Sequence, residues 1–204
     1  MYRYALRACI AAYSVITLIS LPVFGQDEKR EFIGNRQCKL CHNKAAEGAQ
    51  WTVWTKTKHR QAFKVLSSEK ALEVGKNLGL EKPPSESASC LKCHVTGYDE
   101  KTQAVPAQMK MQEGIQCESC HGPASAHMEG GKALRMKKDT TIDIANTIHR
   151  PDVKTCVKCH NAENPTWDPK RYTLENGETT GFDFSQAYQK IKHTNPKKAF
   201  VAKN

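Results

Sequence analysis

The sequence predicts a mainly α-helical fold with long irregular loops, forming a single domain that is organised around bound groups rather than around an apolar core. Large apolar side chains are scarce: the 204 residues include six Phe and three Trp, and 25% of the residues are charged. Such a chain makes a poor core from side chains alone. Four short cysteine–histidine motifs are spread along the chain, and each fits one turn of a helix.

Residues 1–25 are predicted to be a secretory signal peptide, which leaves residues 26–204 as the folded domain. Two arginines open this segment, an uncharged apolar run follows, and Val23-Phe24-Gly25 resembles a cleavage site. A transmembrane anchor is the alternative, but the apolar run is shorter than the roughly 20 residues that span a bilayer. The mature protein is therefore expected in the periplasm or outside the cell, without a membrane anchor.

Helices are expected mainly in the first half of the domain. Asn35 is expected to cap a helix that carries the first motif. Residues 51–66 have apolar side chains at helical spacing from His59, so they are expected to form one helix. Ser68 is expected to cap the next helix, over residues 69–78.

The second half is expected to hold more loop than helix. Residues 99–114 are polar and are expected to form a loop or a short hairpin. Gly130-Gly131 and residues 165–181 are also expected to be loops. Near the end of the chain, Ser185 is expected to cap a short helix.

Eight of the nine cysteines form four C-x-x-C-H motifs. The cysteines are Cys38, Cys41, Cys90, Cys93, Cys117, Cys120, Cys156 and Cys159, and the histidines that close the motifs are His42, His94, His121 and His160. Cysteines three apart lie on one face of a helical turn, where they can form thioethers with the two vinyl groups of one porphyrin. The histidine that follows can bind the iron. The motifs therefore predict four covalently bound haem c groups.

Zinc sites and disulfides are the competing interpretations of these cysteines. Two C-x-x-C pairs can hold one structural zinc ion, and disulfides are common in exported proteins. Neither requires a histidine directly after every pair, whereas haem c attachment does. We therefore favour haem.

Four histidines lie outside the motifs: His59, His127, His149 and His193. Each haem iron has a second axial position, so these residues are candidate distal ligands and predict bis-histidine ligation with low reduction potentials. Methionine is the other common distal ligand and would raise the potential. The candidate methionines are Met109, Met111, Met128 and Met136.

The chain is basic, with a net charge of +10. Residues 1–25 hold two of the 31 basic residues and none of the 21 acidic ones, so the mature part keeps a net charge of +8. A basic chain raises the question of nucleic acid, but the propionates of four haems would offset much of this charge. The remaining lysines are expected to dock an acidic redox partner protein, and no nucleic-acid partner is expected.

The sequence resembles the cytochrome c-554 family, tetrahaem proteins related to the electron acceptor of hydroxylamine oxidoreductase in ammonia-oxidising bacteria. The likeness spans nearly all of residues 32–195. The segments that carry it are FIGNRQCKLCH, WTKTKHRQAF, CLKCHVTGYD, GIQCESCHGPASAH and FDFSQAYQKIKH.

The resemblance implies a particular set of distal ligands. The first and third haems would stack face to face, with His127 on the first and His59 on the third. His193 would bind the fourth haem. The second haem, at residues 90–94, would be five-coordinate with a small open pocket. His149 departs from the family pattern in its spacing, so it would either close the second haem or support another ligand.

The expected function is electron transfer to or from a partner oxidoreductase, by a monomer or weak oligomer. Two alternatives remain open. An open iron at the second haem would allow reduction or binding of nitric oxide or another small nitrogen oxide. Subunits could also polymerise into a filament with haems running end to end, for which a histidine donated between subunits would be the signature.

Overall fold

A computed structural model describes residues 30–138, 141 and 143–194. The predicted signal peptide lies outside these residues and stays a prediction. The α-helices are α1 (Asn35–His42), α2 (Gln50–Thr55), α3 (Glu69–Asn77), α4 (Ala88–His94), α5 (Cys117–His121), α6 (Ser125–Arg135), α7 (Val153–Cys156) and α8 (Phe184–Ile191). The 3₁₀ turns are η1 (Ala45–Glu47), η2 (His59–Gln61), η3 (Lys64–Ser67), η4 (Met111–Glu113) and η5 (Ile144–Asn146).

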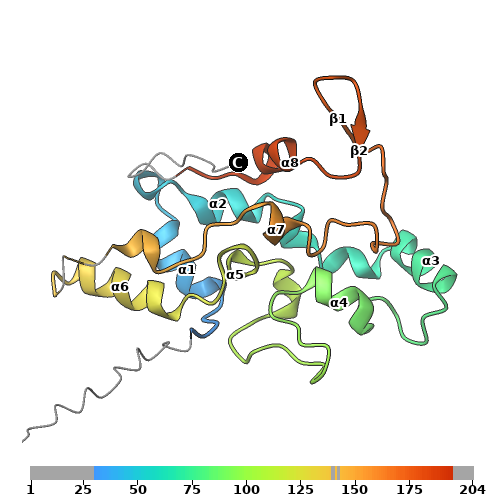
Figure 1. Ribbon diagram of the computed structural model, residues 1–204. Coiled ribbons are helices and arrows are strands. Elements are labelled where there is room, and N and C mark those ends of the chain that lie inside the picture. The colour runs from blue at the N-terminus through green and yellow to red at the C-terminus, as the bar shows by residue number, and fades with distance from the viewer. Residues whose placement is uncertain (1–29, 139–140, 142, 195–204) are drawn as a thin grey trace, which may run out of the picture.

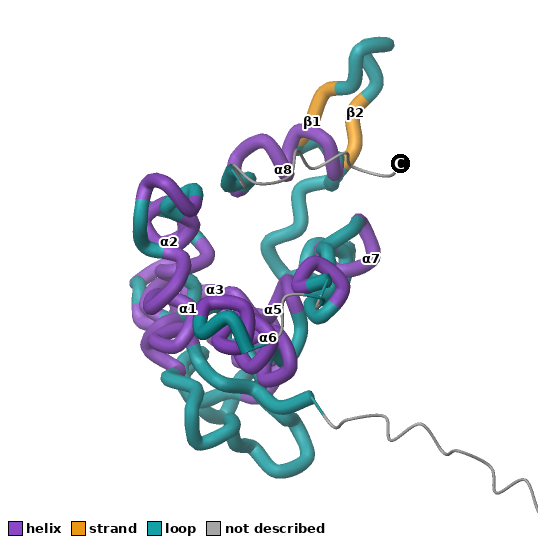
Figure 2. Tube along the Cα trace, turned by 90° about the vertical axis from the view of Figure 1, so that its left-hand side faces the viewer, coloured by secondary structure: helices purple, strands orange, loops and turns teal. Residues whose placement is uncertain are grey.

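The described chain is mainly helical, with long loops and little strand, as the sequence predicts. Strands β1 (Tyr172–Thr173) and β2 (Thr179–Thr180) form an antiparallel hairpin. The hairpin projects from the body of the molecule in both views (Figures 1 and 2). No helix within the described part of the chain is long and apolar enough to cross a membrane.

The motifs sit on helical turns. α1, α4 and α5 each end at the histidine that closes a motif. The fourth motif starts on α7, and its last turn is completed by the N–H of His160, which donates to the carbonyl of Cys156 at 3.0 Å. The helical placement of the motifs is therefore confirmed.

The expected helix over residues 51–66 is wrong. The segment divides into α2, η2 and η3. The N–H of Ile115 donates to the carbonyl of His59 at 3.0 Å, and the indole N–H of Trp54 donates to the carbonyl of Ile115 at 2.8 Å. The carbonyl of His59 thus accepts from a distant loop as well as from the N–H of Ala62, at 3.1 Å, in a 3₁₀ turn instead of a continuous α-helix.

Helix boundaries follow capping chemistry, although two of the expected caps are wrong. Ser68 caps α3, since its hydroxyl accepts the N–H of Ala71 at 3.2 Å. The N-cap of α1 is Gly34, and Asn35 is the first helical residue. The N-cap of α8 is Asp183, whose carboxylate accepts an N–H at 2.8 Å, in place of Ser185.

The expected loop segments are partly ordered. Gly130 and Gly131 lie inside α6, where Gly130 is buried, so the loop expected there is wrong. The expected loop over residues 165–181 contains the β1–β2 hairpin. Residues 99–114 hold one isolated antiparallel bridge, between Asp99 and Ala104, and the turn η4.

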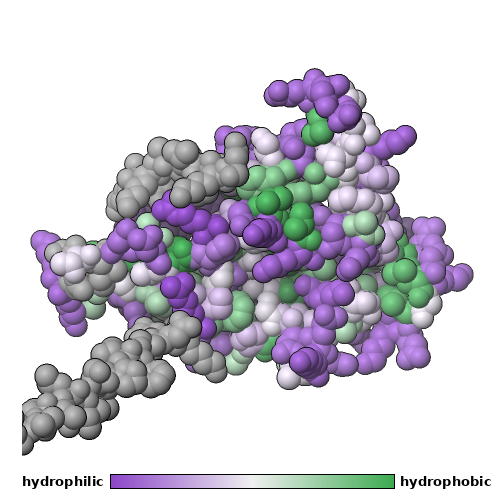
Figure 3. Space-filling model, viewed as in Figure 1, coloured by the Kyte–Doolittle hydropathy of each residue, from purple (hydrophilic) through white to green (hydrophobic). Residues whose placement is uncertain are grey.

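The apolar core is small. Its buried members among the described residues are Leu66, Leu91, Val95, Met109 and Ala124. The first three form one cluster, and Phe63 and Tyr98 are among the partly buried side chains that pack against it. Hydrophobic residues otherwise gather in separate patches on a largely hydrophilic surface (Figure 3). Side chains thus bury little apolar area here, as the composition predicts.

Four buried polar residues, Asn35, Thr96, Gln116 and Glu118, connect the motif helices. The Thr96 hydroxyl accepts the N–H of Gln116 at 2.6 Å and lies 2.6 Å from the hydroxyl of Ser119. The side-chain oxygen of Asn35 accepts the N–H of Cys117 at 3.1 Å. Because buried hydrogen bonds are directional, this network fixes the first, second and third motifs relative to one another.

Candidate functional site

Six of the eight histidines form three facing pairs, and each pair joins one motif histidine to one histidine from elsewhere in the chain. The ring centroids are 6.1 Å apart for His42 and His127, 6.1 Å for His59 and His160, and 5.9 Å for His121 and His193. The corresponding angles between the ring planes are 15°, 67° and 37°.

This spacing matches two axial ligands of one metal ion. Imidazoles on opposite sides of a metal, each bound at about 2 Å, have ring centroids about 6 Å apart, because the ligating nitrogen lies about 1 Å from the ring centre. Each pair offers two nitrogen atoms only. The other coordination positions would have to come from a macrocycle, which is what a porphyrin provides.

His127 lies beside His42, the neighbour that the resemblance implies. The other two histidines lie beside motif histidines other than those that the resemblance implies. His59 lies beside His160 of the fourth motif, and His193 lies beside His121 of the third motif.

Gln50 explains where His193 lies. Its amide nitrogen donates to the carbonyl of Thr194 at 2.9 Å, and its amide oxygen is 3.3 Å from Nδ1 of His42. The segment after α8 is therefore held at the first motif. Since the first and third motifs are neighbours, the same contact brings His193 to His121.

Four histidine rings have Nδ1 close to an oxygen acceptor. These contacts are His42 to the side chain of Gln50 at 3.3 Å, His94 to the carbonyl of Ala62 at 2.6 Å, His121 to the carbonyl of His149 at 2.9 Å, and His127 to the carbonyl of Ile144 at 3.3 Å. A carbonyl requires the proton on Nδ1, which leaves the lone pair on Nε2 free to bind a metal.

Burial favours the neutral form of the paired rings. Desolvation lowers the pKa of five of them, His59, His121, His127, His160 and His193, and the pKa of His193 falls to about 4. A neutral imidazole is the form that coordinates a metal. For His121 and His127, burial and an Nδ1 contact together favour a neutral ring with Nε2 free to bind a metal.

His94 has no facing imidazole among the described residues, and His149 lies elsewhere. The ring of His149 is exposed, and its Nε2 is 3.1 Å from the hydroxyl of Thr155. The backbone of His149 meets His121 twice, since its N–H donates to the carbonyl of His121 at 3.0 Å and its own carbonyl faces Nδ1 of that residue. This placement fits a residue that supports the third motif, and it leaves the second motif without a distal histidine.

The eight motif cysteines are free thiols, none fully exposed. Interaction with Cys117 lowers the pKa of Cys38, and interaction with Cys159 lowers the pKa of Cys93 to about 7. Burial, with a contribution from Cys156, raises the pKa of Cys120 to about 11. The thiols of the first motif therefore lie close to those of the third. Those of the fourth motif lie close to both the second and the third.

The family model described as cytochrome c554 and c-prime matches residues 37–122, the part that contains the first three motifs. The chain is also 28% identical to cytochrome c-554 of Nitrosomonas europaea, over 91% of this chain and 83% of the relative. The resemblance to the cytochrome c-554 family is confirmed. A solved structure of reduced cytochrome c554 from the same organism is 25% identical, with a TM-score of 0.46, and covers 79% of this chain and 78% of that one.

The cytochrome c-554 family implies covalently bound haem c, and the described residues fit that group. Paired thiols and a following histidine lie on one helical turn at each motif. The amide nitrogen of Asn35 is buried without a hydrogen-bond partner, at the contact between the first and third motifs. Its N–H groups are donors of the kind that a haem propionate would satisfy.

Several supporting groups could not be found from the sequence. The carbonyls of Ala62, Ile144 and His149 lie at Nδ1 of His94, His127 and His121, but every residue has a carbonyl, so no residue type signals this role. Gln50 and Glu118 have distinctive side chains, yet their partners are far away in the sequence.

Proposed function

We propose that this chain is an electron-transfer protein that carries four covalently attached haem c groups in the periplasm. Three haems would be bis-histidine ligated, by His42 with His127, by His121 with His193, and by His160 with His59. The second haem, at His94, would be open on its distal side. The observation that carries the proposal is the spacing of the three histidine pairs, 5.9 to 6.1 Å between ring centroids.

Haem c supplies reversible one-electron chemistry when it is bound. The protein's contribution is to fix the ligands and to limit the approach of water. The Nδ1 acceptors orient the rings and make them stronger donors. Bis-histidine ligation keeps reduction potentials low compared with histidine–methionine ligation.

The contacts between motifs support a continuous route for electrons. The first motif neighbours the third, the third neighbours the fourth, and the fourth neighbours the second. The spatial order would therefore be one, three, four, two, with the first and second motifs at the two ends. An electron entering at one end would need to pass only between neighbouring haems.

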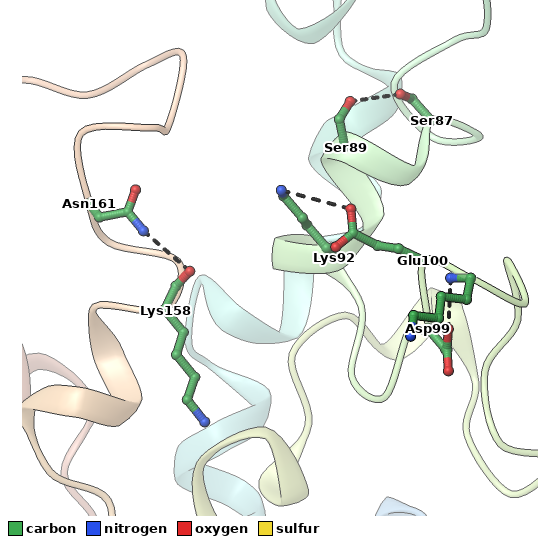
Figure 4. Close-up of polar contacts among 8 residues, drawn as sticks. Ser87, Ser89, Lys92, Asp99, Glu100, Lys158 and Asn161 are labelled. Carbon is green, nitrogen blue, oxygen red and sulfur yellow. Dashed lines mark hydrogen bonds and ion pairs between the residues drawn. The ribbon is translucent and has the colours of Figure 1, made fainter.

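The second motif offers an entry point for a partner protein. Lys92 of α4 has a side chain that is 43% exposed and lies 3.8 Å from Glu100. Lys158, in the fourth motif, is exposed on the segment opposite α4 (Figure 4). Residues 26–204 have a net charge of +8, and such lysines favour an acidic redox partner, for which complementary charge speeds encounter.

A second candidate function is binding or reduction of nitric oxide or another small nitrogen oxide at the second haem. His94 is the motif histidine that has no facing imidazole among the described residues, and its Nδ1 is anchored by the carbonyl of Ala62. An open axial position is what such chemistry requires. The filament alternative has less support, since the three distal histidines of the pairs come from this same chain.

Haem stoichiometry tests the proposal. The full chain would be expressed in a host with haem-attachment machinery, and the intact denatured protein would be weighed by mass spectrometry. We expect the mass of four haems on each chain, with the signal segment removed. A chain without covalent haem, or one that holds zinc on its thiols, would overturn the proposal.

A further inference from the structure

Glu118 is a buried carboxylate inside the third motif. Its exposed fraction is 3%, and it has no ion-pair partner among the described residues. Burial raises the pKa of the Glu118 carboxyl. Hydrogen bonds from the N–H groups of Ile33, Gly34 and Ala124 lower it and so offset part of that rise. A buried carboxylate of this kind needs a structural reason, because taking it out of water is costly.

The carboxylate binds backbone N–H groups from two other segments. Oε1 accepts from Ile33 at 3.0 Å and from Ala124 at 3.0 Å, and Oε2 accepts from Gly34 at 2.8 Å. Gly34 is the N-cap residue of α1, and Ala124 is the N-cap residue of α6. One side chain therefore binds the starts of two helices, where a negative charge is also favoured by the helix dipoles.

These two helices carry the two histidines of one pair. α1 ends at His42, and His127 lies in the first turn of α6. Neither N-cap residue has a side-chain hydrogen bond of its own. The carboxylate of Glu118 binds the N–H groups of both N-cap residues, Gly34 and Ala124, and so fixes the points where the two helices begin.

A second set of hydrogen bonds also joins the segments where α1 and α6 begin. Glu31 and Ser125 exchange two hydrogen bonds, at 2.9 Å and 3.2 Å. These bonds join the same two segments near the surface, while Glu118 joins them inside the protein. Gly34 has φ of +78°, and a Cβ there would lie 2.4 Å from the carbonyl oxygen of Gln108, so its N–H is held in a tightly packed position.

We propose that Glu118 is a positioning residue for His42 and His127, holding the two rings 6.1 Å apart and within 15° of parallel. The inference rests on the proposed function, in which this pair ligates the first haem. In this proposal the third motif supports the first haem, because Glu118 lies between Cys117 and Cys120 of the third motif and would hold the two histidines that ligate the first haem. This role requires a carboxylate, because both side-chain oxygens of Glu118 accept hydrogen bonds from backbone N–H groups.

Glu118→Gln tests this role with little change in shape. An amide has one acceptor oxygen, and its NH₂ group would face a backbone N–H that needs an acceptor. We expect the variant to retain its covalent haems but to lose or shift the low-spin electron paramagnetic resonance signal of the near-parallel pair. Carbon monoxide binding to the reduced protein should rise by about one equivalent per chain as the first iron opens.

The matched control is Glu129→Gln, which neutralises an exposed glutamate on α6 itself. It should leave the spectrum and the carbon monoxide stoichiometry as in the wild type. A Glu118→Gln spectrum identical to that of the wild type would overturn the proposal. Loss of the other two low-spin signals to the same extent would also overturn it, since that would indicate general loosening of the fold.

Hydrogen exchange gives a second test that does not depend on haem loading of the variant. In the wild-type holoprotein, the amides of Ile33, Gly34 and Ala124 should exchange slowly, and in Glu118→Gln these amides should exchange faster while those of α3 stay unchanged. Fast exchange of these amides in the wild type would overturn the proposal. If the wild type itself carried no haem, the proposed function would fail, but the exchange data would still show whether Glu118 holds both helices.

Discussion

The imidazole of His193 lies 5.9 Å from that of His121, centroid to centroid, although the fourth motif is nearer to it in the sequence. The segment that carries His193 is held to Gln50, the first residue of α2, through Thr194. The C-terminal histidine therefore reaches the third motif and leaves the fourth to His59. This arrangement determines which iron each distal histidine would serve, and it leads to the first prediction.

His193→Ala and His59→Ala should open different irons. The first variant should convert the third haem to high spin, and the second should convert the fourth, because each loses one axial ligand. Each should also have a lower melting temperature, since metal–ligand bonds contribute to folding. Electron paramagnetic resonance of the oxidised variants, compared with the wild type, measures both effects. Loss of the same low-spin signal in both variants would contradict the pairing.

The three histidine pairs should give three distinguishable low-spin signals. The angle between axial imidazole planes sets how the iron d orbitals split, and the angles here are 15°, 37° and 67°. The near-parallel pair should give the most rhombic signal, and the His59–His160 pair should give the signal with the largest g value. Spectra of the oxidised wild-type protein test this. Three coincident signals would contradict the geometry.

The second haem should bind one small ligand. Adding carbon monoxide or nitric oxide to the reduced protein should give about one equivalent bound per chain, because in the proposed arrangement one iron of the four would lack a distal histidine. His149→Ala should leave this stoichiometry unchanged, since His149 contacts Thr155 and His121 instead. Absence of binding in the wild type together with binding in His149→Ala would show that His149 closes the second haem.

Gly34→Ala should destabilise the fold more than Gly177→Ala. Both residues have positive φ, +78° and +83°, so alanine costs roughly 1–2 kcal/mol of strain at either position. At Gly34 the new methyl would also lie 2.4 Å from a backbone oxygen, whereas at Gly177 it meets nothing within 4 Å. Thermal unfolding of the two holoprotein variants measures the difference. Equal melting temperatures would show that the loop at Gln108 yields easily.

Capping explains much of what could be predicted locally. Ser68 caps α3 as expected, since a hydroxyl at that position satisfies an N–H that no helix can pair internally. Asn35 is the informative failure. Its residue type suits an N-cap, but its side chain bonds to Cys117 in another motif, and Glu118 accepts the N–H of Gly34, the residue at the N-cap position. A tertiary contact therefore replaced a local one.

Continuous helices were harder to predict than caps. Residues 51–66 have helical periodicity, but the segment divides where it bonds to the distant Ile115, through the carbonyl of His59 and the indole of Trp54. Gly130-Gly131 has the opposite outcome, because the pair lies within α6, with Gly130 buried there and Gly131 near Ile144. Propensity is a weak prior that packing overrides in either direction.

The chemistry of the motifs can be predicted from the sequence alone, because two thiols and a histidine at fixed local spacing fall on one turn of helix wherever that turn lies. The sequence also determined that side chains alone would form a poor core. Only the tertiary structure decided which histidines face one another, that His94 faces none among the described residues, and that Glu118 joins the starts of α1 and α6. These relationships join residues far apart in the chain, and long-range hydrogen bonds such as that of Gln50 to Thr194 set them. Local spacing carries no information about such contacts.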